Sequence, residues 1–137
     1  MFNISKRMML VAVLGIGVAG SGAGPALALT LKEVANATTA TELTALGAKV
    51  LTAGQFKKRV IGRKMTEIKG SWDWIINADG TSLSGGQSSS WKMKGNLYCR
   101  GYEKGEENCS QAFLIGDYLR MTKSGSNDLA GWTVKLD

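Results

Sequence analysis

Two cysteines and the turn between them constrain this chain more than any other feature. Cys99 and Cys109 are the only cysteines among the 137 residues, and a turn-prone Glu-Lys-Gly-Glu segment at 103–106 lies between them. Opposed residues in an antiparallel hairpin have a constant sum of residue numbers, so a turn centred on Lys104 places the two cysteines opposite each other. That arrangement has the geometry that a cross-strand disulfide needs. We therefore expect an antiparallel hairpin closed by a Cys99–Cys109 disulfide.

The cysteine pair has a structural and a redox interpretation. Redox-active pairs usually have C-x-x-C spacing at the start of a helix, which this sequence lacks. Closing a loop of about ten residues would stabilise the fold by about 2.5–3 kcal/mol in the chain-entropy model. Disulfides of this kind are typical of small exported domains. The sequence therefore favours a structural disulfide over a redox-active one.

The first 28 residues have the pattern of a cleavable export signal. Basic residues precede an apolar run at 8–19, and an Ala-Leu-Ala triplet at 26–28 fits the A-x-A site of a signal peptidase. An uncleaved membrane anchor is the alternative, but it needs about 20 steadily apolar residues, and small residues and a proline interrupt the run at 20–25. We expect residues 1–28 to be removed, the mature chain to begin at Leu29, and the protein to be periplasmic or secreted.

A glycine run inside this signal imitates a dinucleotide-binding fingerprint. Gly15, Gly17 and Gly20 have the G-x-G-x-x-G spacing after an apolar stretch. That spacing indicates a nucleotide site only at a strand-turn-helix within a βαβ unit, and the rest of the chain lacks the alternation of strands and helices that such a unit requires. A nucleotide-dependent reductase is therefore a remote alternative, and we expect no cofactor.

Charge and composition exclude several classes of function. The formal net charge is +6, and the chain without residues 1–28 carries +4, because that segment contains two basic residues and no acidic one. This mild basic excess suits an anionic envelope surface and is too weak for a nucleic-acid-binding protein. Histidine is absent, which excludes Ser-His-Asp and Cys-His catalysis and the common zinc sites. We expect no nucleic-acid partner and no metal.

The segment at 29–50 is rich in Ala, Thr and Leu. Leu43, Leu46 and Val50 have helical spacing, but repeated threonines weaken helix formation. We expect a loosely ordered lead that is helical in places.

A short helix is expected within residues 51–62. Thr52 is a suitable N-cap and Gly62 suits the left-handed end of a helix. Phe56 and Val60 lie on one face at i,i+4 spacing. We expect this helix to pack on the mouth or the flank of the domain that follows.

Basic residues follow the other face of this helix and continue past it. They are Lys57, Lys58, Arg59, Arg63 and Lys64. One interpretation is a solvated helix face, and the other is a patch that contacts the anionic membrane surface. The sequence leaves both open.

From Arg63 to the end of the chain, apolar residues alternate with a period of two. Turn signals at 79–80, 95–96 and 116–117 separate roughly eight short strands. This pattern is typical of an antiparallel up-and-down meander, closed as a small barrel or left as a half-barrel. The predicted fold is thus mainly β, with a short N-terminal helix, over residues 51–137.

The strand that carries Cys99 has two distinct faces. Leu97 and Cys99 share one face, while Tyr98, Arg100 and Tyr102 share the other. We interpret the second face as a polar cluster that contacts something outside the domain.

Several short motifs resemble a known group of proteins. Asp-Gly-Thr at 79–81, Ser-Trp at 90–91, Asn-Leu-Tyr-Cys-Arg at 96–100 and Cys109 follow in an order that resembles small secreted lipocalin-like proteins of Gram-negative bacteria, a domain family of unknown function. The resemblance covers residues 51–137. It implies a β-barrel or half-barrel fold and no established reaction.

The sequence departs from the family at one position and offers a second lipocalin-like motif at another. Ser89 stands where the family usually has a glycine two residues before the tryptophan. The Gly-Ser-Trp triplet at 70–72 resembles the lipocalin G-x-W opening, whose tryptophan closes one end of the barrel. The resemblance implies a basic residue stacked on Trp72, for which Arg120 and Lys135 are the candidates.

Large apolar side chains of the predicted strands suggest a ligand site. An eight-stranded barrel has an interior that side chains just fill or that one small ligand occupies. Large apolar side chains of this kind more often form plain core than line a site. The candidate ligand-binding residues are Trp72, Trp74, Trp91, Met93, Arg100, Met121 and Trp132. The sequence is compatible with both interpretations, a filled core and a partly open cup.

The carboxylates do not suggest an enzyme. Glu103, Glu106 and Glu107 crowd one hairpin tip, where exposure would leave them ordinary acids, and a general acid needs burial or a like-charge partner in a cleft. We expect a non-catalytic envelope protein that binds a small apolar or amphipathic ligand or a protein partner. The alternative is a periplasmic inhibitor or structural factor, similar in shape to small β-barrel inhibitors of lysozyme. A basic inhibitor suits basic lysozymes poorly.

Overall fold

The computed structural model describes residues 30–101 and 107–137. The predicted export signal at 1–28, with its glycine run, lies outside the described residues. The tip of the cysteine hairpin at 102–106 also lies outside them, and with it Tyr102, Glu103 and Glu106.

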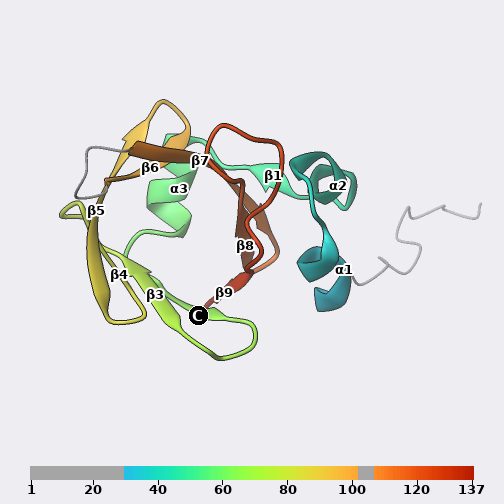
Figure 1. Ribbon diagram of the computed structural model, residues 1–137, viewed down its shortest axis with the longest axis horizontal. Helices are drawn as coiled ribbons and strands as arrows, with labels where there is room; N and C mark the ends of the chain where they lie inside the picture. Colours follow the sequence, from blue (N-terminus) through green and yellow to red (C-terminus); the bar gives the residue numbers. More distant parts are fainter. Residues whose placement is uncertain (1–29, 102–106) are drawn as a thin grey trace, which may run out of the picture.

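Eight of the described strands form a closed antiparallel barrel (Figure 1). Each strand pairs with the next in the chain, and the last pairs with the first. They are β2 (Lys64–Glu67), β3 (Asp73–Ile76), β4 (Thr81–Ser84), β5 (Gln87–Lys94), β6 (Leu97–Gly101), β7 (Glu107–Ile115), β8 (Tyr118–Met121) and β9 (Val134–Leu136). The predicted mainly β meander is confirmed. Its closure follows from the pairing of β2 with β9, through Met65 opposite Leu136 and Glu67 opposite Val134.

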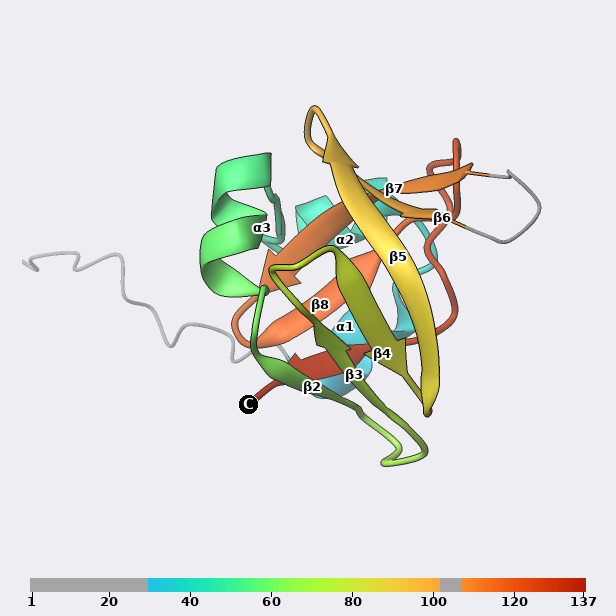
Figure 2. The same cartoon turned by 90° about the vertical axis from the view of Figure 1, so that its left-hand side faces the viewer.

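The barrel has two different ends (Figure 2). We call the end that carries the β3–β4, β5–β6 and β7–β8 turns the helix end, because α3 (Ala53–Arg59) lies there. The opposite end carries the β2–β3 and β4–β5 turns and the β8–β9 connection, and we call it the hollow end. In Figure 1 the strands surround α3 as a ring.

The position of α3 follows from its caps and its one large apolar side chain. Thr52 accepts a hydrogen bond from the backbone of Gln55, and the Gln55 side chain accepts one from Thr52, which forms a capping box. The backbone of Ala53 also donates to the Asn96 side chain, 3.0 Å away in the β5–β6 turn. Phe56 is fully buried against the ring of Tyr98, with 5.3 Å between centroids. The predicted short helix is confirmed, and it packs into the mouth of the barrel.

The cysteine hairpin has the predicted register. Cys99 lies directly opposite Cys109 in the β6–β7 pair, and the two form a disulfide. The pair lies on the outer face of the barrel, so the even-numbered residues of β6 and β7 face the interior.

This register corrects the prediction for the two faces of β6. Tyr98 is 1% exposed and belongs to the interior core, and Arg100 lines an interior cavity described below. The expectation that Tyr98 and Arg100 form an outer contact surface is therefore wrong. A Tyr-x-Arg pair is typical of a solvent-exposed face. Here the tyrosine ring packs in the aromatic core, and the arginine lines a polar cavity.

Residues 30–50 form two short helices and a short strand against the outside of the barrel. They are α1 (Leu31–Asn36), α2 (Ala40–Ala45) and β1 (Lys49–Val50), and β1 pairs with β7. Thr30 and Thr39 cap the two helices, so the threonines that weaken a long helix also provide these starts. Val34 and Leu43 are buried in a second apolar cluster with Phe113 on the outer face of β7. Among the described residues, no helix has the length and apolar character needed to span a bilayer.

Arg120 links these helices to the barrel. Its side chain is 2% exposed, and its guanidinium donates to the backbone oxygens of Val34 at 2.6 Å and Ala130 at 3.0 Å. Burial lowers the pKa of Arg120. Arg120 therefore does not fulfil the expectation of a basic residue stacked on Trp72, because the guanidinium of Arg120 donates to the C-terminal turn of α1. The other candidate, Lys135, lies exposed on β9.

Candidate ligand cavity

The interior of the barrel is filled at the helix end. Phe56 reaches in from α3 and meets Tyr98 and Trp91, whose rings stack at 6.0 Å with an angle of 23° between their planes. The indole of Trp91 donates to the backbone oxygen of Asn77 at 2.8 Å, which holds the ring in place. Met93 packs partly buried against the same core cluster. These contacts fill the centre of this half with aromatic rings.

The hollow end contains an open cavity of about 300 Å³. It extends from the core toward the β8–β9 connection and is bounded by β6 and β7. Its lining residues are Trp74, Tyr98, Arg100, Asn108, Ser110, Met121, Thr122, Lys123, Ser124, Ala130 and Trp132. A cavity of this size lies at the lower limit of small-molecule sites, which run from about 300 to 1,000 Å³.

Aromatic rings form one wall of this cavity. The rings of Trp74 and Trp132 meet edge to face at 5.5 Å, and those of Trp72 and Trp132 meet in the same manner at 5.9 Å. Trp74 also contacts Tyr98 edge to face, at 5.8 Å. Buried Ser82 accepts a hydrogen bond of 2.7 Å from the Trp74 indole. Because T-shaped contacts and a buried hydrogen bond orient the rings, the wall is preorganised for an apolar, preferably flat, group.

Small polar residues and two cations form the rest of the lining. Thr122 accepts a hydrogen bond of 3.0 Å from the backbone of Gln111, and Ser124 accepts one of 3.2 Å from the backbone of Cys109. Each hydroxyl keeps its own proton to donate. With the cationic groups of Arg100 and Lys123, these donors suit an oxygen-rich or anionic group. The cavity therefore combines an apolar wall with a polar side to which Arg100 and Lys123 belong.

Four of the seven predicted ligand-binding residues line this cavity. Trp74, Arg100, Met121 and Trp132 do so directly, and Trp72 supports Trp132 from outside the lining. Trp91 and Met93 lie with the core cluster instead, and Trp91 stacks in the filled half. The structure thus brings all four tryptophans to one cluster but divides them between a filled and a hollow half.

The polar lining residues were missed by sequence reasoning. Asn108 and Ser110 carry no motif, and Ser124 and Lys123 lie in a connection with ordinary turn composition. A usable signal existed in the disulfide, because an outward-facing Cys109 turns Asn108 and Ser110 inward.

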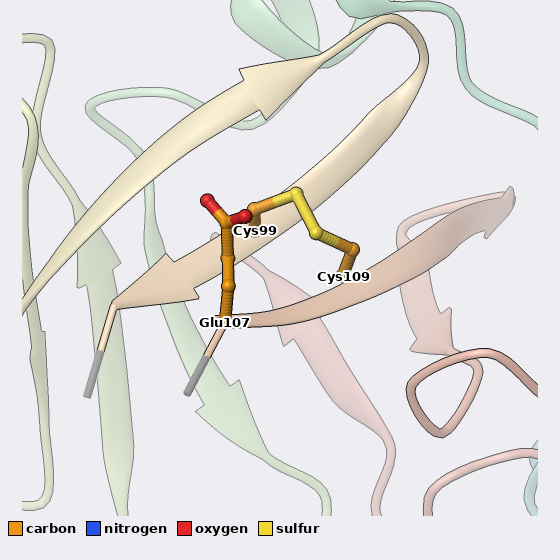
Figure 3. Close-up of side chains that lie close together, drawn as sticks. All are labelled: Cys99, Glu107 and Cys109. Atoms are coloured by element: carbon orange, nitrogen blue, oxygen red, sulfur yellow. A yellow bond between two sulfur atoms is a disulfide. The ribbon is translucent and has the colours of Figure 1, made fainter. Parts of the chain in front are cut away.

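The disulfide and Glu107 form a second cluster, outside the cavity (Figure 3). The Glu107 carboxylate and both sulfurs lie within 4.8 Å of one another. Thiolates bind metals, but these two sulfurs are bonded to each other, so the cluster does not fit a metal ion. Glu107 instead pairs with Lys94 and, at 3.0 Å, with Lys92. Hydrogen bonds from Lys94 and Lys92 lower the pKa of Glu107.

The other shifted carboxyl groups also have lowered pKa values. Hydrogen bonds from the backbone and side chain of Thr38 lower the pKa of Glu42, and those from Thr81 lower that of Asp79. Glu67 is 5% exposed; its burial acts to raise the pKa, but hydrogen bonds from Ser71 and the Lys69 backbone outweigh it and lower the pKa. A general acid at neutral pH needs a shift in the opposite direction. These four groups are therefore suited to structural roles.

Comparison with known proteins adds no relative. No protein family, no curated protein and no solved structure matches this chain. The closed antiparallel barrel is consistent with a lipocalin-like architecture.

Proposed function

We propose that this chain is a non-catalytic, exported protein of the bacterial envelope that binds a small amphipathic ligand at the hollow end of its barrel. The cavity of about 300 Å³ carries this proposal, because an oriented aromatic wall faces polar donors and two cations across it. Concave sites with a mostly apolar wall and a few placed polar groups are typical of ligand pockets.

The ligand is short and flat rather than a long acyl chain. Phe56 and the stacked pair of Trp91 and Tyr98 occupy the helix end, so a chain cannot pass through the barrel. The polar side favours a ligand with an anionic or oxygen-rich head and an apolar body of about one or two rings. The export signal predicted at 1–28 and the Cys99–Cys109 disulfide support a location outside the cytoplasm.

Paired fluorescent probes test this proposal. Anilinonaphthalene sulfonate has a flat apolar body and an anionic group, and phenylnaphthylamine has a similar body without the charge. We expect saturable binding of both, with the sulfonate about tenfold tighter. Near-ultraviolet circular dichroism must remain native, because loosely packed proteins also bind the sulfonate.

A cavity-filling variant and its control locate the site. Ser110 faces the cavity, whereas Ser88 lies exposed on the outer face of β5 opposite Leu83. Ser110→Phe should abolish probe binding, and Ser88→Phe should leave it unchanged. Equal binding by wild-type protein and Ser110→Phe would refute the site. A native mass spectrum of protein from the periplasm then separates the alternatives: a retained small ligand supports the proposal, and a captured protein supports the inhibitor alternative.

A further inference from the structure

A second concave surface lies at the helix end, at the rim of the barrel beside α3. It encloses about 560 Å³ between β1, α3 and the β7–β8 turn. We call it the basic groove, and its lining residues are Gly47, Lys49, Leu51, Gln55, Lys58, Arg59, Leu114, Ile115 and Gly116. Leu51, Leu114 and Ile115 form an apolar floor and are each less than a tenth exposed. A Cβ built on Gly47 or Gly116 would meet no atom within 4 Å, so the groove is open at both glycines.

The cations of the basic groove have no acidic partner among the described residues. Lys64 on β2 pairs with Asp73 at 3.3 Å, and the two lysines of β5 pair with Glu107. Lys49, Lys58 and Arg59 form no ion pair with any residue in the described ranges 30–101 and 107–137; what distinguishes them from other exposed cations is that all three line one groove. Three like charges around one groove repel each other, and an anion bound between them would relieve that repulsion.

The helix dipole explains only part of this cluster. Lys58 and Arg59 belong to the last turn of α3, where positive charge is favourable near the C-terminal carbonyls. Lys49 belongs to a different element, β1, which follows the C-terminal end of α2, and it lines the same groove. A surface gathered from two elements, with an apolar floor, therefore points to a ligand and not only to helix stability.

We infer that the basic groove binds the phosphate headgroup of an anionic membrane phospholipid. Arginine offers two parallel donors to a phosphate, and the lysines add point charges at its sides. The apolar floor suits the glycerol and upper acyl region of a lipid better than a free phosphate, which has no apolar part. Val50, 46% exposed next to Lys49, adds apolar surface at this end of the molecule. Of the basic residues that the sequence suggested for membrane contact, Lys58 and Arg59 line this groove, and Lys49 joins them. The groove is separate from the ligand cavity, so the two proposals are independent.

Matched charge variants test the inference on vesicles. The groove variant combines Lys49→Gln, Lys58→Gln and Arg59→Gln. The control variant combines Lys57→Gln, Lys69→Gln and Lys135→Gln, which are exposed residues outside the groove lining and remove the same charge. Vesicles contain phosphatidylcholine with or without phosphatidylglycerol, and flotation measures binding. We expect phosphatidylglycerol-dependent binding that falls on the order of a hundredfold in the groove variant, the size expected for three basic residues at an anionic bilayer. The control variant should lose only a few-fold.

Equal losses in both variants would show a response to net charge alone and would overturn the inference, as would no binding by the wild-type protein. Millimolar inorganic phosphate at constant ionic strength distinguishes the source of the phosphate. Lipid binding should resist it, whereas complete displacement would show a site for soluble phosphate compounds and reject the lipid. Ser110→Phe should keep vesicle binding, so failure of the ligand cavity and failure of the groove can be told apart.

Discussion

The two ends of the barrel are built from the same ring of strands but are occupied differently. At the helix end, Phe56 enters from α3 and completes an aromatic stack with Tyr98 and Trp91. At the hollow end, small polar residues such as Asn108 and Ser110 face inward, and a cavity remains between them and Trp132. An eight-stranded ring has just enough room for side chains, so the sizes of a few inward residues decide which half is core and which is a site.

Removal of the Phe56 ring should have the largest effect on stability. Phe56→Ala leaves a cavity where a fully buried ring stood, and we expect a loss of about 3–5 kcal/mol in the free energy of unfolding. Urea denaturation measures it. Lys57→Ala, one residue along the same helix and exposed, should change stability by less than about 0.5 kcal/mol. Similar costs for the two variants would mean that α3 is not an integral part of the core.

Loss of the disulfide should affect the hollow end more than the helix end. The Cys99→Ser, Cys109→Ser double variant removes a link across 10 residues, and we expect a loss of about 2.5–3 kcal/mol. Arg100, Asn108 and Ser110 adjoin the bridge and line the cavity, so probe binding should weaken as well. Urea denaturation and probe titration measure the two effects. A thiol assay on denatured, unreduced wild-type protein that detects two thiols would contradict the disulfide itself.

Local patterns in the sequence predict much of the fold. The cysteine spacing predicts the β6–β7 register, because summed residue numbers depend on nothing outside the hairpin. Thr52 and Phe56 likewise indicate a helix with one buried face. The sequence does not decide between a full and a half barrel, since the pairing of β2 with β9 joins segments about 70 residues apart and produces no local pattern.

The candidate site was harder to predict than the fold. Tryptophans identify the wall because they are rare, large and periodic, but Ser110 and Ser124 resemble any exposed serine. The face of Arg100 was assigned wrongly, since hydrophobic alternation assumes an apolar interior, and this interior is polar at one end. Arg120 was one of two candidates for stacking on Trp72, because no local pattern reveals that its partners are backbone oxygens of α1 and the β8–β9 connection.

The cap of α3 should contribute less than its buried ring. In Thr52→Ala the hydroxyl that accepts from the Gln55 backbone is lost, and we expect a cost of about 1 kcal/mol. Thr52→Ser keeps an accepting hydroxyl and should recover most of that stability. Thermal unfolding of the three proteins under identical conditions provides the comparison. If serine fails to rescue, the threonine acts through its methyl group and not as a cap.

The smallest expected effect is a pH dependence that separates the interior of the hollow end from the outer face. Glu67 and Glu107 both have lowered pKa values, but for different reasons. Burial of Glu67 acts to raise its pKa and is outweighed by hydrogen bonds from Ser71, at 2.9 Å, and from the Lys69 backbone, at 2.8 Å. Hydrogen bonds from Lys94 and Lys92 lower that of Glu107.

Both carboxylates stabilise the folded state more at higher pH, and the response to salt distinguishes their contributions. A folded-state pKa below the unfolded value means that each group stabilises the fold above its unfolded pKa, near 4.5, and that this contribution is lost as pH falls through the folded pKa. Glu67→Gln and Glu107→Gln should each reduce the slope of the unfolding free energy against pH in this acid range. High salt screens exposed lysines, so it should remove most of the Glu107 contribution while the neutral donors preserve that of Glu67. Equal salt sensitivity of the two slopes would show that Glu67 is held by charge rather than by its buried hydrogen bonds.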